Sequence, residues 1–267
     1  MTRLPAACAA LCLAAAPALA QEGYDCLMDP LRTIELASPA AGLLEEVLVE
    51  RGDAVARGQL VARLTSEIEE STVELLTLRA ETEAVVAAQA KQVGMMERRF
   101  DRVSRLQDRG VATQEALDQV ETELIAAQSL LMQAELNRNL ALKELARAKI
   151  ALGERSIRSP VDGVVQERAM SGGEYVSSDD HVVKIVQLDP LRVEAFLPVS
   201  LYGRIGIGAQ AVVHPAPPIE GAYPAEVVAV DPVFDAASAT FVVVLELPNP
   251  DRKLPAGHRC SLEIGGS

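Results

Sequence analysis

The most regular pattern in this chain is a helical repeat near its middle. Between Glu115 and Leu152, apolar residues recur at alternating spacings of three and four, as in a helix that packs along one seam. The stretch from Glu67 to Asp108 carries the same spacing with polar interruptions. In the second stretch the seam is apolar except for one arginine: Leu117, Val120, Leu124, Ala127, Leu131, Ala134, Arg138, Ala141, Leu145, Ala148 and Leu152. The pattern predicts two helices that pack against each other.

The residues between these stretches indicate a sharp reversal. Arg109-Gly110 is typical of a helix C-terminus, and Thr113 is suited to cap the next helix. Residues 67–155 are therefore expected to form an antiparallel coiled-coil hairpin, about 60 Å long at about 1.5 Å per residue.

Two arginines, Arg79 and Arg138, fall on the predicted seam. Ion pairs with Glu144 and Glu83 across the seam would satisfy them, and so would side chains that extend to water. Both interpretations stay open from the sequence.

The hairpin interrupts a repeated strand-and-turn motif. Ser38-Pro39-x-x-Gly42 matches Ser159-Pro160-x-x-Gly163, and Gly52-Asp53-x-Val55 matches Gly173-Glu174-x-Val176, at a constant offset and without gaps. Gly42, Gly52, Gly163 and Gly173 stand where the chain needs a positive φ or a missing side chain. Each copy predicts an apolar strand (43–49; 164–170), a turn and a second short strand. Since neither copy can bury its apolar face alone, residues 36–66 and 156–187 are expected to pair with each other.

Residues 188–267 lose the helical period. Strand candidates bounded by Pro and Gly cover 191–197, 209–214, 225–230, 240–247 and 260–264, and only 199–205 suits a helical turn. This block predicts a small antiparallel β-barrel.

Composition and charge exclude several partners. The formal net charge is −13, so the chain would repel phosphate backbones and anionic headgroups. Aromatic residues make up 3% of the chain and Trp is absent, which leaves little surface for base stacking. Nucleic acid is therefore not an expected partner.

The first residues predict export. Arg3 precedes an apolar run that ends in Ala18-Leu19-Ala20, the pattern of a Sec signal peptide with its cleavage site, so residues 1–20 are expected to be removed. A membrane span is the alternative, but the run is shorter than the roughly 20 residues a spanning helix needs. Lipidation at Cys8 or Cys12 is a further alternative. No later stretch is long and apolar enough to span.

Two cysteines, Cys26 and Cys260, remain after processing. In an oxidising compartment an isolated pair predicts a disulfide, which would join the N-terminal segment 21–35 to the last strand. Two separate buried thiols are the alternative.

Catalytic chemistry is not expected. The sequence shows no nucleophile arrangement, no phosphate-binding glycine loop and no paired acids in a plausible cleft. His181, His214 and His258 lie far apart without ligand spacing, and Asp179-Asp180-His181 is expected to form a turn that matches Gly58-Gln59-Leu60 in the first copy. We therefore predict no metal, no cofactor and no enzyme activity.

Taken with the signal peptide, the two glycine-turn copies, the inserted hairpin and the strands that follow, the chain resembles the periplasmic adaptor subunits, or membrane fusion proteins of the HlyD and RND type, of bacterial tripartite efflux systems. Residues 37–60, Gly208-Ala-Gln-Ala-Val and Leu254-Pro-Ala-Gly257 look like motifs of that family. The resemblance implies an elongated, multi-domain α+β fold. A lipoyl-like (barrel-sandwich hybrid) domain would be interrupted by the coiled-coil hairpin and followed by the β-barrel.

The resemblance also implies partners and a site. Arg102, Leu106 and Thr113 match the family's Arg-x3-Leu-x6-Ser spacing, with Thr in place of Ser, and together with Gly110 would form a channel-binding hairpin tip. The implied partners are an inner-membrane efflux pump, an outer-membrane channel of the TolC type and further copies of the chain in a ring, as a hexamer or trimer of dimers. The implied location is the periplasm, peripheral to the inner membrane.

One departure from the family bears on the pump. Larger members have a fourth, membrane-proximal domain built from both termini, whereas here only a short segment precedes the first copy, so the inner-membrane docking surface is expected to be reduced. The short tip motif and the lack of an N-terminal anchor helix favour an RND pump over an ABC exporter.

Two other classes of protein compete with the adaptor. A lipoyl or biotinyl carrier would need a modifiable lysine at the hairpin that joins the two copies, but the coiled coil occupies that place and Lys91, Lys143 and Lys149 lie inside predicted helices. A structural coiled-coil protein without a channel partner would use Arg102 only as a solvated charge and Leu106 only as a seam residue.

Overall fold

The structure is a computed structural model that describes residues 23–177 and 179–265. The expected signal peptide, residues 1–20, lies outside the described residues. The chain divides into two compact units, one formed by Thr33–Val186 and the other by the residues up to Arg32 together with those from Gln187 onward. We call them the hairpin unit and the strand unit.

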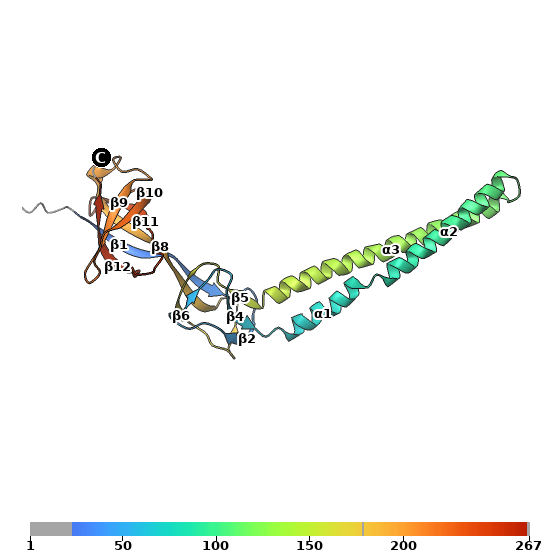
Figure 1. Cartoon of the computed structure of the whole chain (residues 1–267), viewed down its shortest axis with the longest axis horizontal. Coiled ribbons are helices and arrows are strands. Elements are labelled where there is room, and N and C mark those ends of the chain that lie inside the picture. Colours follow the sequence, from blue (N-terminus) through green and yellow to red (C-terminus); the bar gives the residue numbers. More distant parts are fainter. Residues whose placement is uncertain (1–22, 178, 266–267) are drawn as a thin grey trace, which may run out of the picture. The chain divides into compact units, whose positions relative to one another are not determined.

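The hairpin unit contains three helices (Figure 1), α1 (Glu67–Glu81), α2 (Ala84–Asp108) and α3 (Gln114–Gly153). Both α1 and α2 pack against α3. The heptad pattern predicted this seam correctly, because every buried residue of α3 lies on it: Val120, Ala127, Ala134, Ala141 and Leu145.

The first helical stretch is not continuous, contrary to the prediction of one helix over 67–108. It is interrupted at Thr82-Glu83, where Thr82 is extended with ψ 100° and its hydroxyl donates to the carbonyl of Leu78 at 2.6 Å. The break falls where Arg79 and Thr82 occupy seam positions. Polar side chains there give α3 little apolar surface to hold the helix straight.

The seam arginines form ion pairs across the hairpin. Nη2 of Arg138 lies 2.5 Å from Oε1 of Glu83, and Nη1 of Arg79 lies 3.7 Å from Oε2 of Glu144. The ion-pair interpretation is therefore confirmed for both. All four side chains remain at least one-third exposed, so each pair stabilises the hairpin only weakly.

The β-strands of the hairpin unit interlock the two sequence copies. The first copy contributes β2 (Gly42–Val47), β3 (Ala54–Val55) and β4 (Leu60–Leu64), and the second contributes β5 (Ser156–Arg158), β6 (Gly163–Arg168), β7 (Tyr175–Val176) and the start of β8 (His181–Pro198). Strand β2 pairs with β7, while β3 pairs with β6. Each copy thus pairs its short turn strand, β3 or β7, with a strand of the other copy. The sequence predicted that the two copies pair.

Equivalent positions of the two copies make equivalent contacts. The hydroxyl of Ser38 donates to the carbonyl of Ala40, and that of Ser159 donates to the carbonyl of Val161. The core is likewise built from matched positions that are all buried, Leu44 with Val165, Val55 with Val176, Val61 with Val182, and Leu64 with Ile185. The repeat is therefore an approximate two-fold symmetry of one shared core.

The four turn glycines have two different physical roles. Gly52 and Gly173 have φ of +96° and +89°, the left-handed region that favours glycine. Gly42 and Gly163 allow close approach instead: a Cβ would lie 2.8 Å from Nη1 of Arg155 at the first and 2.6 Å from the carbonyl oxygen of Val186 at the second.

The strand unit is an antiparallel sheet in the order β1-β12-β9-β10-β11-β8. Its strands are β1 (Tyr24–Ala37), β9 (Gln210–Pro215), β10 (Tyr223–Asp235), β11 (Thr240–Leu247), β12 (His258–Ile264) and the later part of β8, with a short 3-10 helix η1 (Val199–Leu201). The core is aliphatic except for Met28, Phe241 and the disulfide. Every strand expected in 188–267 is present, whereas β1 was not expected as a strand.

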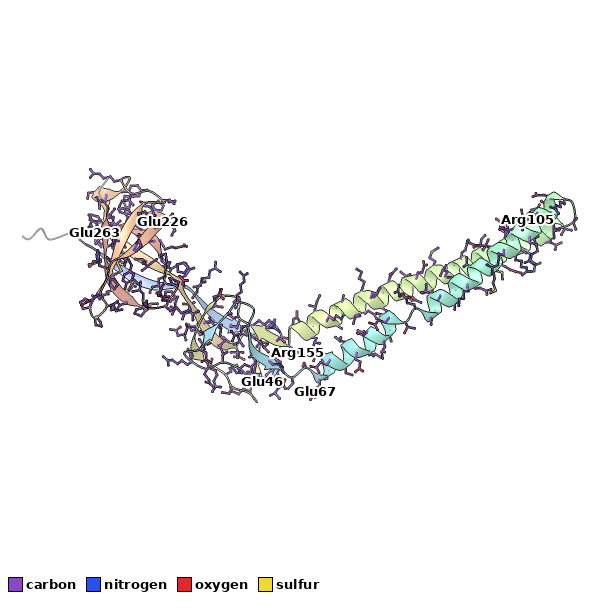
Figure 2. The ribbon with its side chains drawn as sticks, in the orientation of Figure 1. Glu46, Glu67, Arg105, Arg155, Glu226 and Glu263 are labelled. Carbon is purple, nitrogen blue, oxygen red and sulfur yellow. A yellow bond between two sulfur atoms is a disulfide. The ribbon has the colours of Figure 1, made fainter. Side chains whose placement is uncertain are left out.

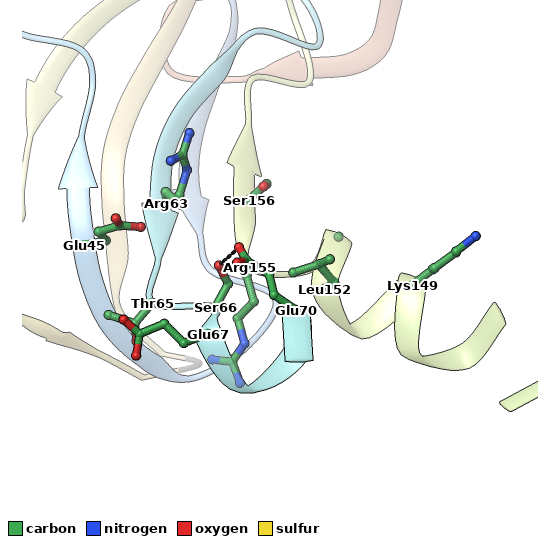
Figure 3. A pocket seen from close by; sticks show the side chains of 11 residues that line it. Glu45, Arg63, Thr65, Ser66, Glu67, Glu70, Lys149, Leu152, Arg155 and Ser156 are labelled. Carbon is green, nitrogen blue, oxygen red and sulfur yellow. Dashed lines mark hydrogen bonds between the residues drawn. The ribbon is translucent and has the colours of Figure 1, made fainter. Parts of the chain in front are cut away.

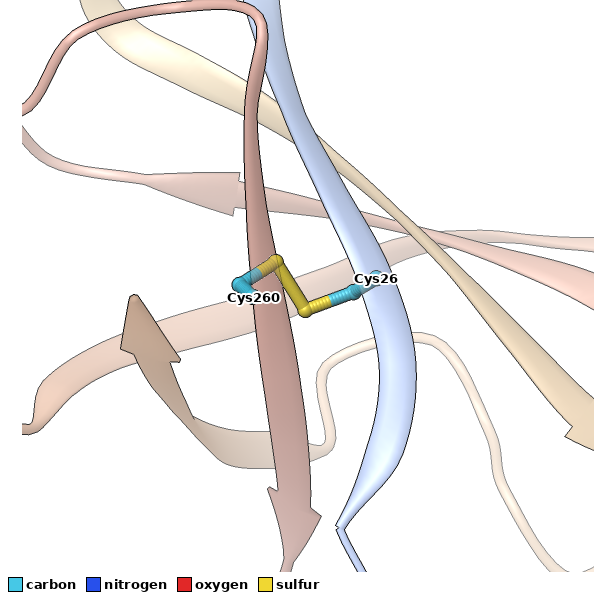
Figure 4. Close-up of a disulfide and its surroundings, with 2 residues drawn as sticks. All are labelled: Cys26 and Cys260. Carbon is cyan, nitrogen blue, oxygen red and sulfur yellow. A yellow bond between two sulfur atoms is a disulfide. The ribbon is translucent and has the colours of Figure 1, made fainter. Parts of the chain in front are cut away.

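A disulfide joins two neighbouring strands of this sheet that lie far apart in the sequence (Figure 4). Cys26 on β1 is directly opposite Cys260 on β12, and their sulfur atoms are bonded across a sequence separation of 234 residues. Both residues are buried. The bond ties the N-terminal segment to the last strand, in the arrangement that the sequence predicted.

Candidate functional site

The hairpin tip is the loop that joins α2 to α3, together with the helical turns beside it. The carbonyl of Leu106 accepts hydrogen bonds from the backbone N–H groups of Val111, at 2.9 Å, and Ala112, at 3.3 Å. Gly110 has φ +72°, and its N–H donates to the carbonyl of Gln107 at 2.8 Å. A left-handed glycine therefore ends α2, as expected from the sequence.

Thr113 begins α3 as its N-cap. Its backbone is extended, with φ −83° and ψ 158°, and its hydroxyl oxygen accepts from the N–H of Ala116 at 3.2 Å. This is the capping role predicted for it. Because the hydroxyl accepts in this contact, its own hydrogen is left free to donate to a partner.

Arg102 and Leu106 lie one helical turn apart on α2 and so share a face of that helix. Both side chains are exposed, and Leu106 leaves 38% of its surface to solvent. The structure brings the four predicted tip residues, Arg102, Leu106, Gly110 and Thr113, to the same end of the hairpin.

The sequence analysis missed an exposed apolar side chain at the tip. Val111 lies inside the loop and is 71% exposed, far more than Leu106. Nothing in the heptad pattern marks Val111, because the pattern ends with the helices.

The sequence analysis also missed a concentration of positive charge, which we call the tip arginine cluster. Its members lie on α2 and at its end: Arg98, Arg99, Arg102, Arg105 and Arg109. All are exposed, and Figure 2 labels Arg105 among them. Arg99 is paired with Glu123 of α3 at 2.5 Å, while the other four make no ion pair within the described residues. Although the chain has a net charge of −13, this cluster is locally positive, and the pattern of charges along the sequence could have revealed it.

The opposite end of the hairpin is anchored to the β-strands by Arg155 (Figure 3). Its guanidinium contacts Glu69 of α1 at 2.5 Å and donates to the carbonyl of Ala41 at 3.1 Å. Beside it, the Ser66 hydroxyl donates to Glu70 at 2.7 Å, as the dashed line shows. A cavity of about 570 Å³ lies here, lined by side chains of both charges. These contacts satisfy one another, so we interpret this region as a structural junction.

Asp180, in the expected Asp179-Asp180-His181 turn, and its counterpart Gln59 in the first copy have structural roles. Asp180 accepts hydrogen bonds from the N–H and hydroxyl of Ser177, at 3.0 and 2.7 Å, which lower the pKa of its carboxyl and close a turn. Gln59 closes the matching turn of the first copy by accepting from Ala56 N–H at 2.9 Å. In the described part of the chain, no three His, Cys, Asp or Glu side chains gather as metal ligands would.

Over residues 23–177 and 179–265, no helix combines the length and the apolar character that crossing a membrane requires.

Two interlocked β-copies opened by a helical hairpin define a barrel-sandwich hybrid domain with a helical insertion. More specifically, the chain belongs to the family described as CzcB-like, barrel-sandwich hybrid domain, whose model matches residues 32–187. The family resemblance inferred from the sequence is thereby confirmed.

Curated relatives extend the similarity beyond that domain. The chain is 28% identical over 232 residues to nodulation protein NolF of Rhizobium meliloti (strain 1021), covering 86% of this chain and 59% of that protein. It is 24% identical over 191 residues to the cobalt-zinc-cadmium resistance protein CzcB of Cupriavidus metallidurans, covering 69% of this chain and 33% of that one. The chain thus spans only part of the length of these relatives.

Solved structures share the fold. MacA from Actinobacillus actinomycetemcomitans superposes with a TM-score of 0.74 at 20% identity, covering 91% of this chain and 77% of that chain. The membrane fusion protein Spr0693 from Streptococcus pneumoniae R6 gives a TM-score of 0.60 at 15% identity, with 91% and 98% covered. At these identities the likeness concerns the fold alone.

Proposed function

We propose that the chain is a non-catalytic periplasmic adaptor that links an inner-membrane efflux transporter of the RND type to an outer-membrane channel of the TolC type. The observation that carries this proposal is the hairpin tip, where exposed apolar side chains stand beside arginines that make no ion pair within the described residues. The printed names of relatives support it: PvdR of Pseudomonas aeruginosa is a pyoverdine export membrane fusion protein, and MacA of Yersinia pestis is a macrolide export protein.

The tip has the chemistry to contact the ends of helices in a partner. Leu106 and Val111 offer apolar surface, while Arg102 and Arg105 offer several N–H donors each. Arginine binds carboxylates strongly and is favoured near the negative C-terminal ends of helices. A channel whose helical ends expose carbonyl or carboxylate oxygens would therefore fit this tip, with Thr113 supplying one further donor.

The remaining parts of the chain take supporting roles in this proposal. Residues 67–155 act as the arm toward the channel, residues 36–66 and 156–187 form the lipoyl-like domain, and residues 188–267 with β1 close into a β-barrel. Pairing of β1 with β8, in addition to β12, supports closure. Export by the signal peptide 1–20 agrees with the Cys26–Cys260 disulfide, because such bonds persist in oxidising compartments.

Assembly into a ring requires contacts between copies, and α3 offers a surface for them. Ile125, Met132, Leu136 and Leu140 are 52% to 68% exposed and recur every seven or four residues. They lie on the side of α3 opposite its buried seam residues, such as Ala134. We call this surface the outer stripe and propose that a neighbouring copy of the hairpin covers it, in a hexamer or a trimer of dimers.

The test is co-purification from crosslinked membranes. The tagged chain is expressed in its host, crosslinked gently, solubilised and purified, and its partners are identified by mass spectrometry. The wild type is expected to recover both a transporter and a channel. Arg102→Glu and Leu106→Asp are expected to lose the channel, keep the transporter and abolish complementation of efflux, with unchanged helix content by circular dichroism.

Arg147→Glu serves as the matched control, because Arg147 is an exposed, unpaired arginine on α3 away from the tip. It should behave as the wild type. Retention of the channel by both tip variants would refute the tip assignment. Recovery of an ABC permease would replace the RND pump, and recovery of neither partner would favour a structural coiled-coil protein.

A further inference from the structure

The strand unit contains a groove of about 780 Å³ that the adaptor proposal does not use. It lies along the end of β10 and the start of β11, where Phe234 and Phe241 face it, and extends to Phe196 of β8 and Tyr24 of β1. All of these residues belong to the same unit. The groove is therefore a feature of one compact body.

Aromatic side chains are concentrated here to an unusual degree. The chain has only four Tyr and four Phe, and half of these eight line the groove. Tyr202 packs behind them, with its ring centre 4.8 Å from that of Phe234 and 5.3 Å from that of Phe241, both edge to face. These edge-to-face contacts restrain the rings of Phe234 and Phe241, so this part of the groove lining is held in place.

The aromatic surface is left open to solvent. Phe241 is 1% exposed and forms part of the core, but Phe196 and Phe234 are 44% and 43% exposed, and Val233 is 71% exposed. Keeping apolar surface of this kind in water costs free energy at about 25 cal/mol per Å². A ligand that covers the rings would recover that free energy.

The charge of the groove is of one sign. Among the residues that the structure describes, the only charged ones that line it are Asp25 and Asp235, both exposed, and no Lys or Arg does so. The carboxylate of Asp235 accepts from the N–H of Ala237 at 2.9 Å, which together with the Ser238 hydroxyl lowers the pKa of that carboxyl. The carboxylate of Asp235 is therefore ionised at neutral pH, and no cationic side chain among the described residues lines the groove beside it.

We propose that this groove binds a small amphiphilic organic cation, with an aromatic or alkyl body and a positive charge. The volume lies within the range of about 300–1,000 Å³ typical of sites for small molecules. The rings of Phe196, Phe234 and Tyr24 can hold the apolar body and attract the charge through their faces. Asp25 and Asp235 complement that charge at the rim.

This site is independent of the transporter and channel proposed above, because binding is measured on the isolated chain. The probes are tetraphenylphosphonium and tetraphenylborate, which have the same shape and opposite charge. Each is titrated into the purified full chain by calorimetry at 0.15 M salt, where charges more than about 8 Å apart are largely screened. We expect the phosphonium to bind at least tenfold more tightly than the borate.

Two kinds of variant separate the roles of the rings and the acids. Phe196→Ala should weaken phosphonium binding about fivefold, the effect of losing one ring contact worth about 1 kcal/mol. The double variant Asp25→Asn, Asp235→Asn should bring the two probes toward equal affinity, since asparagine keeps the capping oxygen but removes the charge. Thermal unfolding checks that each variant is folded.

Matched controls lie outside the groove. Tyr175→Ala removes a 66% exposed ring from the hairpin unit, and Asp29→Asn with Glu246→Gln removes two charges from the strand unit. Neither should change phosphonium binding. Equal affinity of the two probes for the wild type, no binding of either, or equal losses in the control variants would overturn the proposal. Dissociation of self-associated copies by Phe196→Ala would also overturn it, because a second copy would then be the occupant.

Discussion

Arg155 shows how single side chains fix the base of the hairpin. It stands at the junction of α3 and β5 and reaches both Glu69 and the carbonyl of Ala41. Its guanidinium occupies the space that Gly42 leaves open, since a Cβ there would lie 2.8 Å away. The side chains of Arg155 and Glu69 are only 21% and 19% exposed. This ion pair is therefore the most sheltered in the hairpin unit and is worth more than a surface pair.

Replacing Arg155 by methionine is expected to lower the free energy of unfolding by about 3 kcal/mol, because it leaves the sheltered Glu69 carboxylate without its partner. Urea denaturation followed by circular dichroism measures the change. Arg147→Met is the control, since Arg147 is exposed and makes no ion pair in the described chain, and it should change stability by no more than about 0.5 kcal/mol. Equal losses in both variants would show that the junction does not depend on this pair.

The Glu35–Lys184 ion pair predicts a pH dependence. The hydrogen bond at 2.8 Å lowers the pKa of Glu35 below its ordinary 4.5 and raises that of Lys184 above its ordinary 10.5. Because the pKa of Glu35 is lowered on folding, its contribution to stability is fully present above pH 4.5 and is lost as the pH falls through the lowered pKa. Because the pKa of Lys184 is raised on folding, its contribution is fully present below pH 10.5 and is lost as the pH rises through the raised pKa.

Lys184→Met should therefore be less stable than the wild type at pH 7, and the difference should shrink as the pH falls toward 3 and Glu35 takes up a proton. Urea midpoints at the two pH values measure it. The difference at pH 7 should also fall in 1 M salt, because Glu35 is half exposed and Lys184 is partly exposed to solvent. A difference that is constant with pH would mean that Lys184 acts through packing alone; Lys149→Met, at an exposed lysine without an ion pair, gives the baseline.

At the scale of elements, the hairpin depends on how α2 stops and α3 starts. Gly110 takes a left-handed backbone at the reversal, and nothing lies near the position of its missing Cβ. A side chain at Gly110 would therefore cost free energy because of the backbone conformation, and not because it would contact its neighbours. Gly153, at the end of α3, has equally open surroundings but does not have a positive φ.

Gly110→Ala is expected to destabilise the chain by about 1 kcal/mol, the cost of a left-handed backbone in an L-residue. Gly153→Ala should be neutral or stabilising, because alanine is favoured over glycine in a helix. Thermal unfolding of both variants measures the contrast. If the two variants shift the melting temperature equally, the reversal does not require the left-handed residue.

The sequence predicted these elements unevenly. The interlocked copies could be foreseen because their turns depend on local residues, such as Gly52 and Gly173, and because the repeat aligned them. The break at Thr82 could not, since a polar seam position does not reveal whether a helix stays intact or ends. Strand β1 was missed because it gains its partner β12 from the far end of the chain. The aromatic groove was missed because Phe196 and Phe234 meet only after the strands pair.

At the scale of the whole molecule, the outer stripe decides whether copies associate. Met132→Glu and Leu136→Glu place charges at exposed apolar positions of α3 without touching its buried seam. Each is expected to shift the chain toward monomer in sedimentation velocity, by at least tenfold in the association constant, because a charge would be buried between copies. Ala126→Glu adds the same charge on the flank of α3, about a quarter turn from the outer stripe, and should leave assembly unchanged. Unchanged association in the stripe variants would contradict a hairpin-to-hairpin contact.

The exchange of turns between the two copies has a consequence for the order of folding. When the chain is made from its N-terminus, β2 can pair only with β4, and β3 has no partner, until β6 and β7 on the far side of the hairpin become available. The helices need only each other, and contacts that are closer in sequence form faster than distant ones. We therefore expect the hairpin to form first and to bring the two copies together. The helical hairpin would thus have two roles. It would first be the scaffold on which the β-domain folds, and then the part of the chain that extends toward a partner.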